Sequence, residues 1–117
     1  MPFPIIRTLE EFNEAVKKSH EKPLLLLKHS TACGISAGAL ATVEDFANIY
    51  DAIDYRMVLV IENRELSREI ASITGIPHQS PQVILFHEGK PIWHTSHWSI
   101  RAKSMKKALN SIGIPVD

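Results

Sequence analysis

Hydrophobic residues recur along this chain with two periods, and the changes of period predict helices and strands in alternation. A capping pattern begins at Thr8 and apolar residues three and four positions apart follow it, so a helix is predicted over about 8–20. Four consecutive leucines at 24–27, bounded by proline and by polar residues, predict a short strand buried on both faces. By the same rules the later elements are a helix from Cys33 to about Tyr50, a strand at 56–61, a helix from Asn63 to Gly75, strands at 83–86 and 91–95 joined by the turn 88–90, and a last helix that stops at Gly113.

The order of these elements predicts an α/β fold. Buried strands that are linked by helices pair in parallel, whereas the hairpin adds antiparallel strands, so the sheet is mixed and helices cover both of its faces. Four strands are predicted, and Pro4-Ile5-Ile6 would add a short fifth strand at an edge. The 117 residues fit one domain, which we place at 1–117, because typical domains hold roughly 100–150 residues.

Charge and composition exclude several classes of partner. Thirteen Lys+Arg balance thirteen Asp+Glu, so the net charge of +0 provides no basic field for nucleic acid or for an anionic membrane. No apolar run approaches the roughly 20 residues that span a bilayer, and the N-terminus shows no secretory signal. We therefore expect a soluble intracellular protein with no nucleic-acid or membrane partner.

The chain has a single cysteine, Cys33, which excludes an internal disulfide and a cysteine-rich metal cluster. It follows the first buried strand and begins the second helix, where free amides and the helix dipole favour the reactive thiolate. The alternative is a small buried hydrophobic side chain. Ser36 lies where dithiol oxidoreductases have their second cysteine, so a hydroxyl is available to hydrogen-bond the thiolate but not to resolve a mixed disulfide. His29 either stabilises the thiolate or exchanges its proton, or it is a structural histidine.

Two loops are candidates for binding. Ser80-Pro81 precedes the third buried strand, and a cis bond there would expose the backbone, although the local sequence favours an ordinary trans proline. Ser96, His97 and Trp98 precede the last helix, where free amides suit a carboxylate and the two rings offer a flat face and hydrogen bonds to a small polar ligand. The alternative for Trp98 is packing at the edge of the core. His94 and His97 supply only two of the about four ligands of a closed zinc site, so no metal is predicted.

These motifs, in this order, resemble those of the thioredoxin superfamily, and within it the small monothiol bacilliredoxin-like proteins of the bacillithiol redox system. The likeness covers roughly residues 5–112 and rests on three segments: Lys28-His29-Ser30-Thr31-x-Cys33-x-Ile35-Ser36, Ser80-Pro81-Gln82 and His94-x-Ser96-His97-Trp98. It implies a thioredoxin-like fold, a cis bond at Ser80-Pro81 facing Cys33, and removal of bacillithiol, a cysteine-containing low-molecular-weight thiol, from protein mixed disulfides. It also implies a cytoplasmic, bacterial location.

On this interpretation Cys33 is the catalytic nucleophile of a monothiol oxidoreductase, with no tightly bound cofactor and with bacillithiol as co-substrate. The partners are bacillithiolated client proteins, the small thiol and an optional reductase, and the protein acts as a monomer. The residues expected to stabilise the thiolate are Ser36, His29 and Thr31. The residues expected to bind the substrate or the small thiol are Ser80, Pro81, Ser96, His97 and Trp98.

Gly34 departs from the family motif, in which proline follows the cysteine, because glycine lacks the fixed φ of proline and restores an amide donor. The segment Cys33-Gly34-x-Ser36 also resembles the monothiol glutaredoxins. That resemblance implies an alternative, a dimeric iron–sulfur carrier in which Cys33 of each subunit and two small thiols hold the cluster. The chain lacks the glutaredoxin Gly-Gly segment, however, and has Ser96-His97-Trp98 in its place. A third alternative is a redox-inert interaction module of the same fold.

Overall fold

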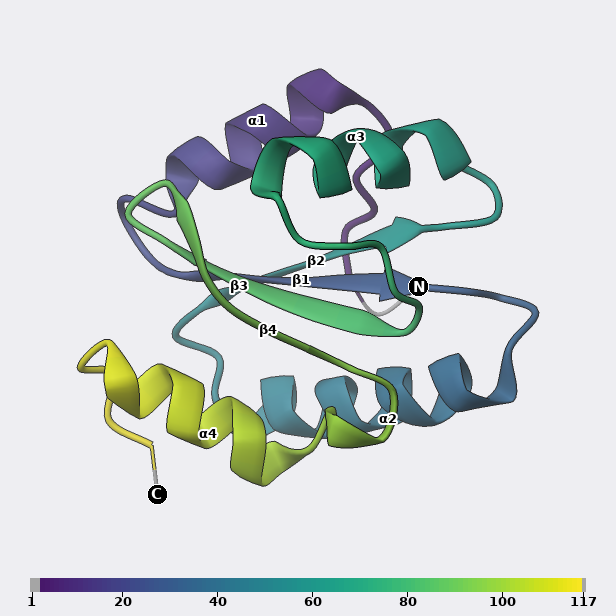
Figure 1. Cartoon of the computed structure of the whole chain (residues 1–117). Helices are drawn as coiled ribbons and strands as arrows, with labels where there is room; N and C mark the ends of the chain where they lie inside the picture. The colour runs from purple at the N-terminus through teal and green to yellow at the C-terminus, as the bar shows by residue number, and fades with distance from the viewer. Residues whose placement is uncertain (1–2, 117) are drawn as a thin grey trace.

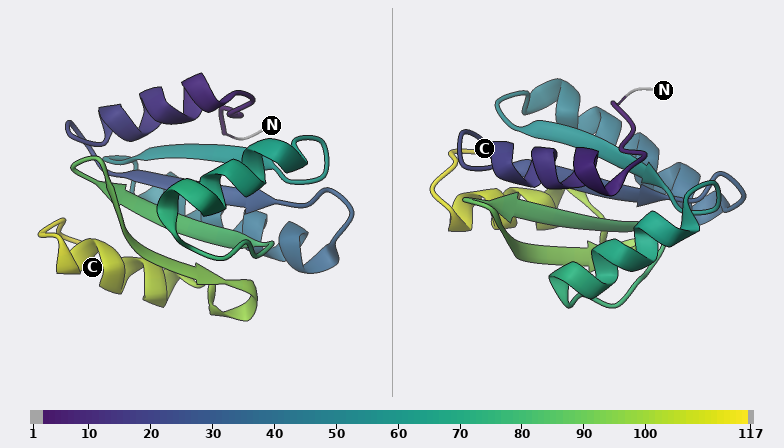
Figure 2. Two further views of the ribbon diagram at one scale, coloured as in Figure 1. Left: turned by 45° about the horizontal axis from the view of Figure 1, so that its top comes forward. Right: turned by 90° about the horizontal axis from the view of Figure 1, so that it is seen from above.

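The computed structural model describes residues 3–116, in which a four-stranded mixed sheet lies between two layers of helices (Figure 1). The strands are β1 (Leu24–His29), β2 (Asp54–Leu59), β3 (Gln82–His87) and β4 (Lys90–Ser96), and their order in the sheet is β2-β1-β3-β4. The helices are α1 (Leu9–Lys18), α2 (Gly34–Ile49), α3 (Arg64–Thr74) and α4 (Ala102–Ser111), with a short 3-10 turn, η1 (His97–Ser99), before α4. Helices α1 and α3 cover one face of the sheet, and α2 and α4 cover the other (Figures 1 and 2).

The pairing of the strands confirms the mixed sheet. β1 and β2 are parallel, because α2 returns the chain to the end of the sheet at which β1 began. β3 runs antiparallel to both β1 and β4, and β3 and β4 form the predicted hairpin. Within residues 3–116 the expected fifth strand at Pro4-Ile5-Ile6 does not form, and Ile5 makes an isolated parallel bridge to Met57.

Strand β1 lies at the centre of the sheet and separates two hydrophobic clusters. Leu25 and Leu27 belong to the cluster under α2 and α4, and Leu24 and Leu26 belong to the cluster under α1 and α3. The four leucines are at most 3% exposed, which confirms the prediction of a strand buried on both faces. The strand extends two residues beyond them, however, and its polar end, Lys28-His29, is also buried.

The helix ends agree with the sequence prediction in part. The hydroxyl of Thr8 accepts a hydrogen bond from the amide of Glu11 at 3.1 Å, as a capping residue should, but the carboxylate of Glu11 accepts from the amide of Arg7 instead of Thr8. Gly75 ends α3 with a φ of +73°, in the left-handed region that favours glycine. Asn63 precedes α3, but its side chain donates to the carbonyl of Arg7 and does not cap the helix.

Three connections meet at one end of the sheet. Lys28 near the end of β1 pairs with Gln82 at the start of β3, and Gln82 pairs with Ser96 at the end of β4. The loop from β1 into α2, the loop before β3 and the turn from β4 into α4 therefore lie at this same end.

None of the helices among residues 3–116 has the length and apolar character needed to cross a membrane.

Candidate active site

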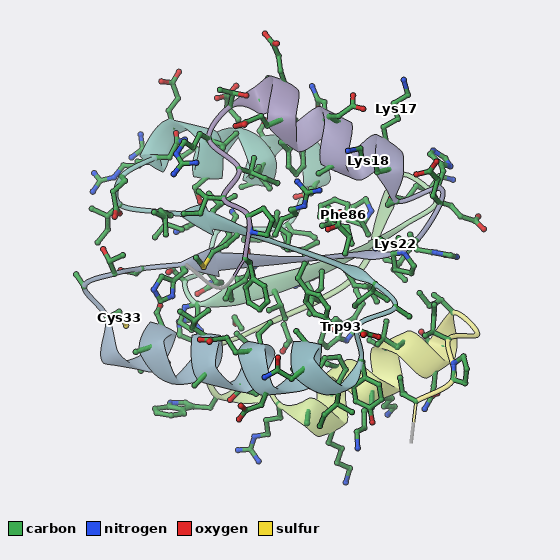
Figure 3. The ribbon with its side chains drawn as sticks, turned by 180° about the vertical axis from the view of Figure 1, so that it is seen from behind. Lys17, Lys18, Lys22, Cys33, Phe86 and Trp93 are labelled. Atoms are coloured by element: carbon green, nitrogen blue, oxygen red, sulfur yellow. The ribbon has the colours of Figure 1, made fainter. Side chains whose placement is uncertain are left out.

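Cys33 occupies the capping position of α2, with extended backbone angles (φ −122°, ψ 124°). Its carbonyl accepts from the amide of Ala37 at 3.2 Å, and its own amide donates to the carbonyl of Ser30 at 3.3 Å. The thiol therefore stands at the open amino end of a helix and is partly exposed to solvent. Figure 3 shows Cys33 at the margin of the molecule, at the end of α2, whereas Phe86 lies between the helix layers.

The electrostatic environment of Cys33 favours its charged form. Hydrogen bonds from the amides of Ser36 and Ile35 lower the pKa of the Cys33 thiol below its ordinary value, and the hydroxyl of Ser36 contributes in the same direction. The small degree of burial opposes this shift and does not reverse it. Because the thiolate is the nucleophilic form, the helix end prepares Cys33 for attack on a disulfide.

Ser36 faces the sulfur of Cys33 and also stabilises the loop between β1 and α2. Its side chain is fully buried and accepts a hydrogen bond from the amide of Ser30 at 3.3 Å. One hydroxyl thus links the start of the loop to the first turn of α2. Thr31, in contrast, is exposed, and its hydroxyl donates to the carboxylate of Glu62 at 3.4 Å. The hydroxyl of Thr31 is thus directed to a carboxylate beyond β2, and Thr31 is not among the groups that lower the pKa of Cys33, so its expected role at the thiolate stays a prediction.

His29 is 6% exposed, and its Nδ1 has no hydrogen-bond partner among residues 3–116. Burial lowers the pKa of His29, while a backbone hydrogen bond with Ser36 and the charge of Glu62 act against that shift. The imidazole is therefore neutral near pH 7 and does not stabilise the thiolate as a cation. Two alternatives for His29 stay open, proton exchange with the sulfur and a structural role in the core.

A cleft of about 620 Å³ opens beside the thiol. Its walls are the amino end of α2 and the turn between β4 and α4, two segments that are distant in sequence. Of the residues expected to bind substrate or small thiol, His97 and Trp98 line the cleft with Cys33, and Trp98 is 71% exposed. Trp98 therefore does not pack at the edge of the core. The full lining is Cys33, Gly34, Ile35, Gly38, Ala39, Thr42, His97, Trp98, Ile100 and Arg101.

Ser80, Pro81 and Ser96 do not line this cleft but adjoin it. The Ser80-Pro81 bond is cis, as the family resemblance implied and as the local sequence alone did not favour. The carbonyl of Pro81 accepts from the amide of His97 at 3.0 Å, so the proline loop is tied to a residue of the cleft. His97 has a φ of +53°, which is uncommon for a residue with a side chain, and it turns the chain from β4 into η1.

Sequence reasoning missed part of the cleft. On α2, Gly34, Gly38 and Thr42 recur at a spacing of four, which places them on one helix face, and this spacing could have identified that wall. Arg101 gave no comparable signal, because only the packing of the β4–α4 turn against α2 brings it near Cys33.

Among residues 3–116, no group of three or more His, Cys, Asp or Glu side chains is arranged to hold a metal ion.

Solved structures show the same fold. A protein described as an oxidoreductase with a thioredoxin fold is 30% identical, with 90% of this chain and 91% of that chain covered and a TM-score of 0.83. Mitochondrial thioredoxin 3 from Saccharomyces cerevisiae is 16% identical over 93% of this chain and 94% of that chain, with a TM-score of 0.75. Thioredoxin from Trypanosoma brucei brucei is 17% identical over 94% and 89%, with a TM-score of 0.74.

The fold and a lone cysteine at a helix amino end define a monothiol member of the thioredoxin superfamily. A family model described as monothiol bacilliredoxin BrxC matches residues 5–105. The chain belongs to this family, and its family and fold are those of thiol oxidoreductases.

Proposed function

We propose that this protein removes bacillithiol from protein mixed disulfides through Cys33. The observation that carries the proposal is that a thiol with a lowered pKa, at the amino end of α2, opens on a cleft large enough for a small molecule. Membership in the monothiol bacilliredoxin family supports bacillithiol as the small thiol. With one cysteine in the chain, the second sulfur of the reaction must come from outside.

The reaction consists of two exchanges in which electrons balance. The thiolate of Cys33 attacks the bacillithiol sulfur of the client disulfide, a new disulfide forms between Cys33 and bacillithiol, and the client thiolate leaves and takes a proton from solvent. A second bacillithiol thiolate then attacks the bacillithiol sulfur on Cys33. Oxidised bacillithiol leaves, and the Cys33 thiolate is regenerated. A reductase that returns oxidised bacillithiol to the thiol would complete the cycle.

The neighbouring residues have distinct proposed roles. Ser36 stabilises the thiolate before attack and again after release, through its amide and hydroxyl. His97 and Trp98 contact the small thiol from the opposite wall of the cleft. Ser80, Pro81 and Ser96 form the adjoining surface that receives the client, because the carbonyl of Pro81 accepts from the amide of His97 and so ties this loop to the cleft.

We place this activity in the cytoplasm of a bacterium that makes bacillithiol. The chain acts as a monomer without a tightly bound cofactor, and its partners are bacillithiolated clients, the free thiol and the reductase. These assignments rest on the chemistry of a lone thiol and on the family, because a reducing compartment keeps such a thiol available for exchange.

The test uses a purified client protein with one bacillithiolated cysteine. Wild-type protein is expected to free the client and to gain the mass of one bacillithiol on Cys33, as measured by intact mass spectrometry. Cys33→Ser is expected to leave the client modified, whereas Ser36→Ala, which keeps the nucleophile, retains partial activity. Release of bacillithiol by Cys33→Ser at the wild-type rate would refute the mechanism. Exposure to oxidised bacillithiol and oxidised glutathione in competition then identifies the preferred small thiol, which is expected to be bacillithiol.

A further inference from the structure

Besides the thiol of Cys33, the cleft contains a positive charge that no carboxylate of the lining neutralises. Arg101 lines the cleft opposite α2, and no Asp or Glu is among the lining residues of the described chain. The wall from α2 is formed by small or apolar side chains and one hydroxyl. Any anion that enters the cleft therefore meets a guanidinium group and no competing carboxylate.

The guanidinium group of Arg101 is held in place with part of its donor capacity unused. Its Nε donates to the backbone carbonyl of Trp98 at 2.8 Å, which ties the side chain to the turn before α4. Within residues 3–116 no ion pair involves Arg101, and no hydrogen bond involves its two terminal nitrogens. A planar guanidinium with free terminal nitrogens is suited to bind a carboxylate by two parallel hydrogen bonds.

The rest of the cleft has room for the uncharged part of a ligand. Gly34 and Gly38 face it from α2, and a Cβ added at either position would meet nothing within 4 Å. Trp98, 71% exposed, offers a flat apolar surface on the other side. The volume of about 620 Å³ lies within the range of about 300–1,000 Å³ that is typical of small-molecule sites.

We propose that Arg101 selects anionic low-molecular-weight thiols by binding a carboxylate of the thiol whose sulfur bonds to Cys33. This inference rests on the proposed function, because it concerns the small thiol in the mixed disulfide that Cys33 attacks. Arg101 touches the non-reacting part of the substrate and takes no part in the exchange of sulfurs. Its contact orients the disulfide so that the small-thiol sulfur, and not the client sulfur, faces Cys33.

The test varies the charge of the small thiol and keeps the client constant. One reporter peptide is prepared as its mixed disulfide with mercaptosuccinate, which has two carboxylates, with neutral 2-mercaptoethanol and with cationic cysteamine. The rate of peptide release by the protein is divided by the rate at which 2-mercaptoethanol attacks the same disulfide. For the wild type we expect this normalised rate to be about tenfold higher for mercaptosuccinate than for the neutral thiol, and lowest for cysteamine.

Two variants separate Arg101 from the overall charge of the protein. Arg101→Gln is expected to reduce the tenfold preference to about twofold or less. Lys103→Gln removes one exposed charge from the same helix, outside the cleft, and is expected to keep the preference. An equal preference in Arg101→Gln and wild type, or an equal loss in both variants, would overturn the role of Arg101. If the wild type releases the peptide from none of the three disulfides, the proposed thiol exchange itself fails.

Discussion

Lys28 and Cys33 lie close together in the sequence, and both have a lowered pKa, but the physical causes are opposite. Lys28 is on β1 with 0% exposure, and burial lowers the pKa of its ammonium to about 8. Cys33 is partly exposed at the end of α2, and hydrogen bonds from the amides of Ser36 and Ile35 lower its pKa. In the first case the fold destabilises a charge, and in the second it stabilises one.

The partners of the two groups explain this difference. The Nζ of Lys28 donates to the carbonyl of Ser67 at 3.0 Å and lies 3.3 Å from Nδ1 of His78, and among residues 3–116 no carboxylate pairs with it. Burial first, and then the charges of Lys28 and Arg68, lower the pKa of His78, so the His78 ring is neutral near pH 7. A shifted pKa therefore marks a reactive group only where the charged form is stabilised and the group opens to a cleft, as at Cys33.

The largest predicted effect concerns Lys28 and is a change of stability with pH. Below about pH 8 the amine is protonated in both states, so folding buries a charge. Between about pH 8 and the unfolded value of 10.5 the folded amine is neutral while the unfolded one is still charged, so the unfolded state binds more protons and stability rises with pH. We expect wild type to gain about 2–3 kcal/mol relative to Lys28→Met across this window.

Urea unfolding at pH 7, 9 and 10.5 measures this gain. Both proteins are compared in a Cys33→Ser background, so that titration of the thiol does not contribute. Lys28→Met fills a similar volume without a charge, and it is expected to be at least as stable as its parent at pH 7. Parallel stability profiles in the two proteins would show that the buried amine titrates normally and that the contrast with Cys33 is wrong.

The second prediction concerns the donors at Cys33. Ser36→Ala removes the hydroxyl that faces the sulfur and that accepts from Ser30, while it keeps the backbone amide. The pKa of Cys33 is expected to rise, and the iodoacetamide alkylation rate at pH 7 to fall about threefold to fivefold, because less thiolate is present. Thr31→Val is the matched control, since its hydroxyl is directed to Glu62, and its alkylation profile should coincide with that of wild type. Equal pKa values in Ser36→Ala and wild type would limit Ser36 to a structural role.

Local sequence was sufficient for most of the fold and for the nucleophile. The leucines of β1, the glycine at the end of α3 and the hairpin turn each have a local physical cause, so the elements that they predict are present. The sequence pattern indicates Lys28 as a polar boundary of the strand, because it does not show that α3 will cover this residue. The cis bond at Ser80-Pro81 also depends on packing between distant segments, and only the family resemblance implied it.

The site was less predictable than the fold for the same reason. Cys33 and Ser36 were found because their helix position is local information. The contact of Thr31 could not be predicted in this way, because its partner, Glu62, lies in the loop after β2. Arg101 joins the cleft only when the β4–α4 turn packs on α2, and no spacing within either segment indicates that contact. Long-range contacts therefore determine which polar residues lie in the cleft of Cys33 and which are directed elsewhere.

The smallest predicted effect concerns Gly34, the residue at which this chain departs from its family motif. It is the first residue of α2, and a Cβ there would meet nothing within 4 Å. Proline at a first helical position needs no amide hydrogen bond and restricts the unfolded chain, so Gly34→Pro is expected to raise the free energy of unfolding by about 0.4–1 kcal/mol. The amides that lower the pKa of Cys33 belong to Ser36 and Ile35, not to Gly34, so the alkylation profile should be unchanged. A shift of that profile by Gly34→Pro would show that the glycine itself tunes the thiol, and that the donors to Cys33 extend to the first amide of the helix.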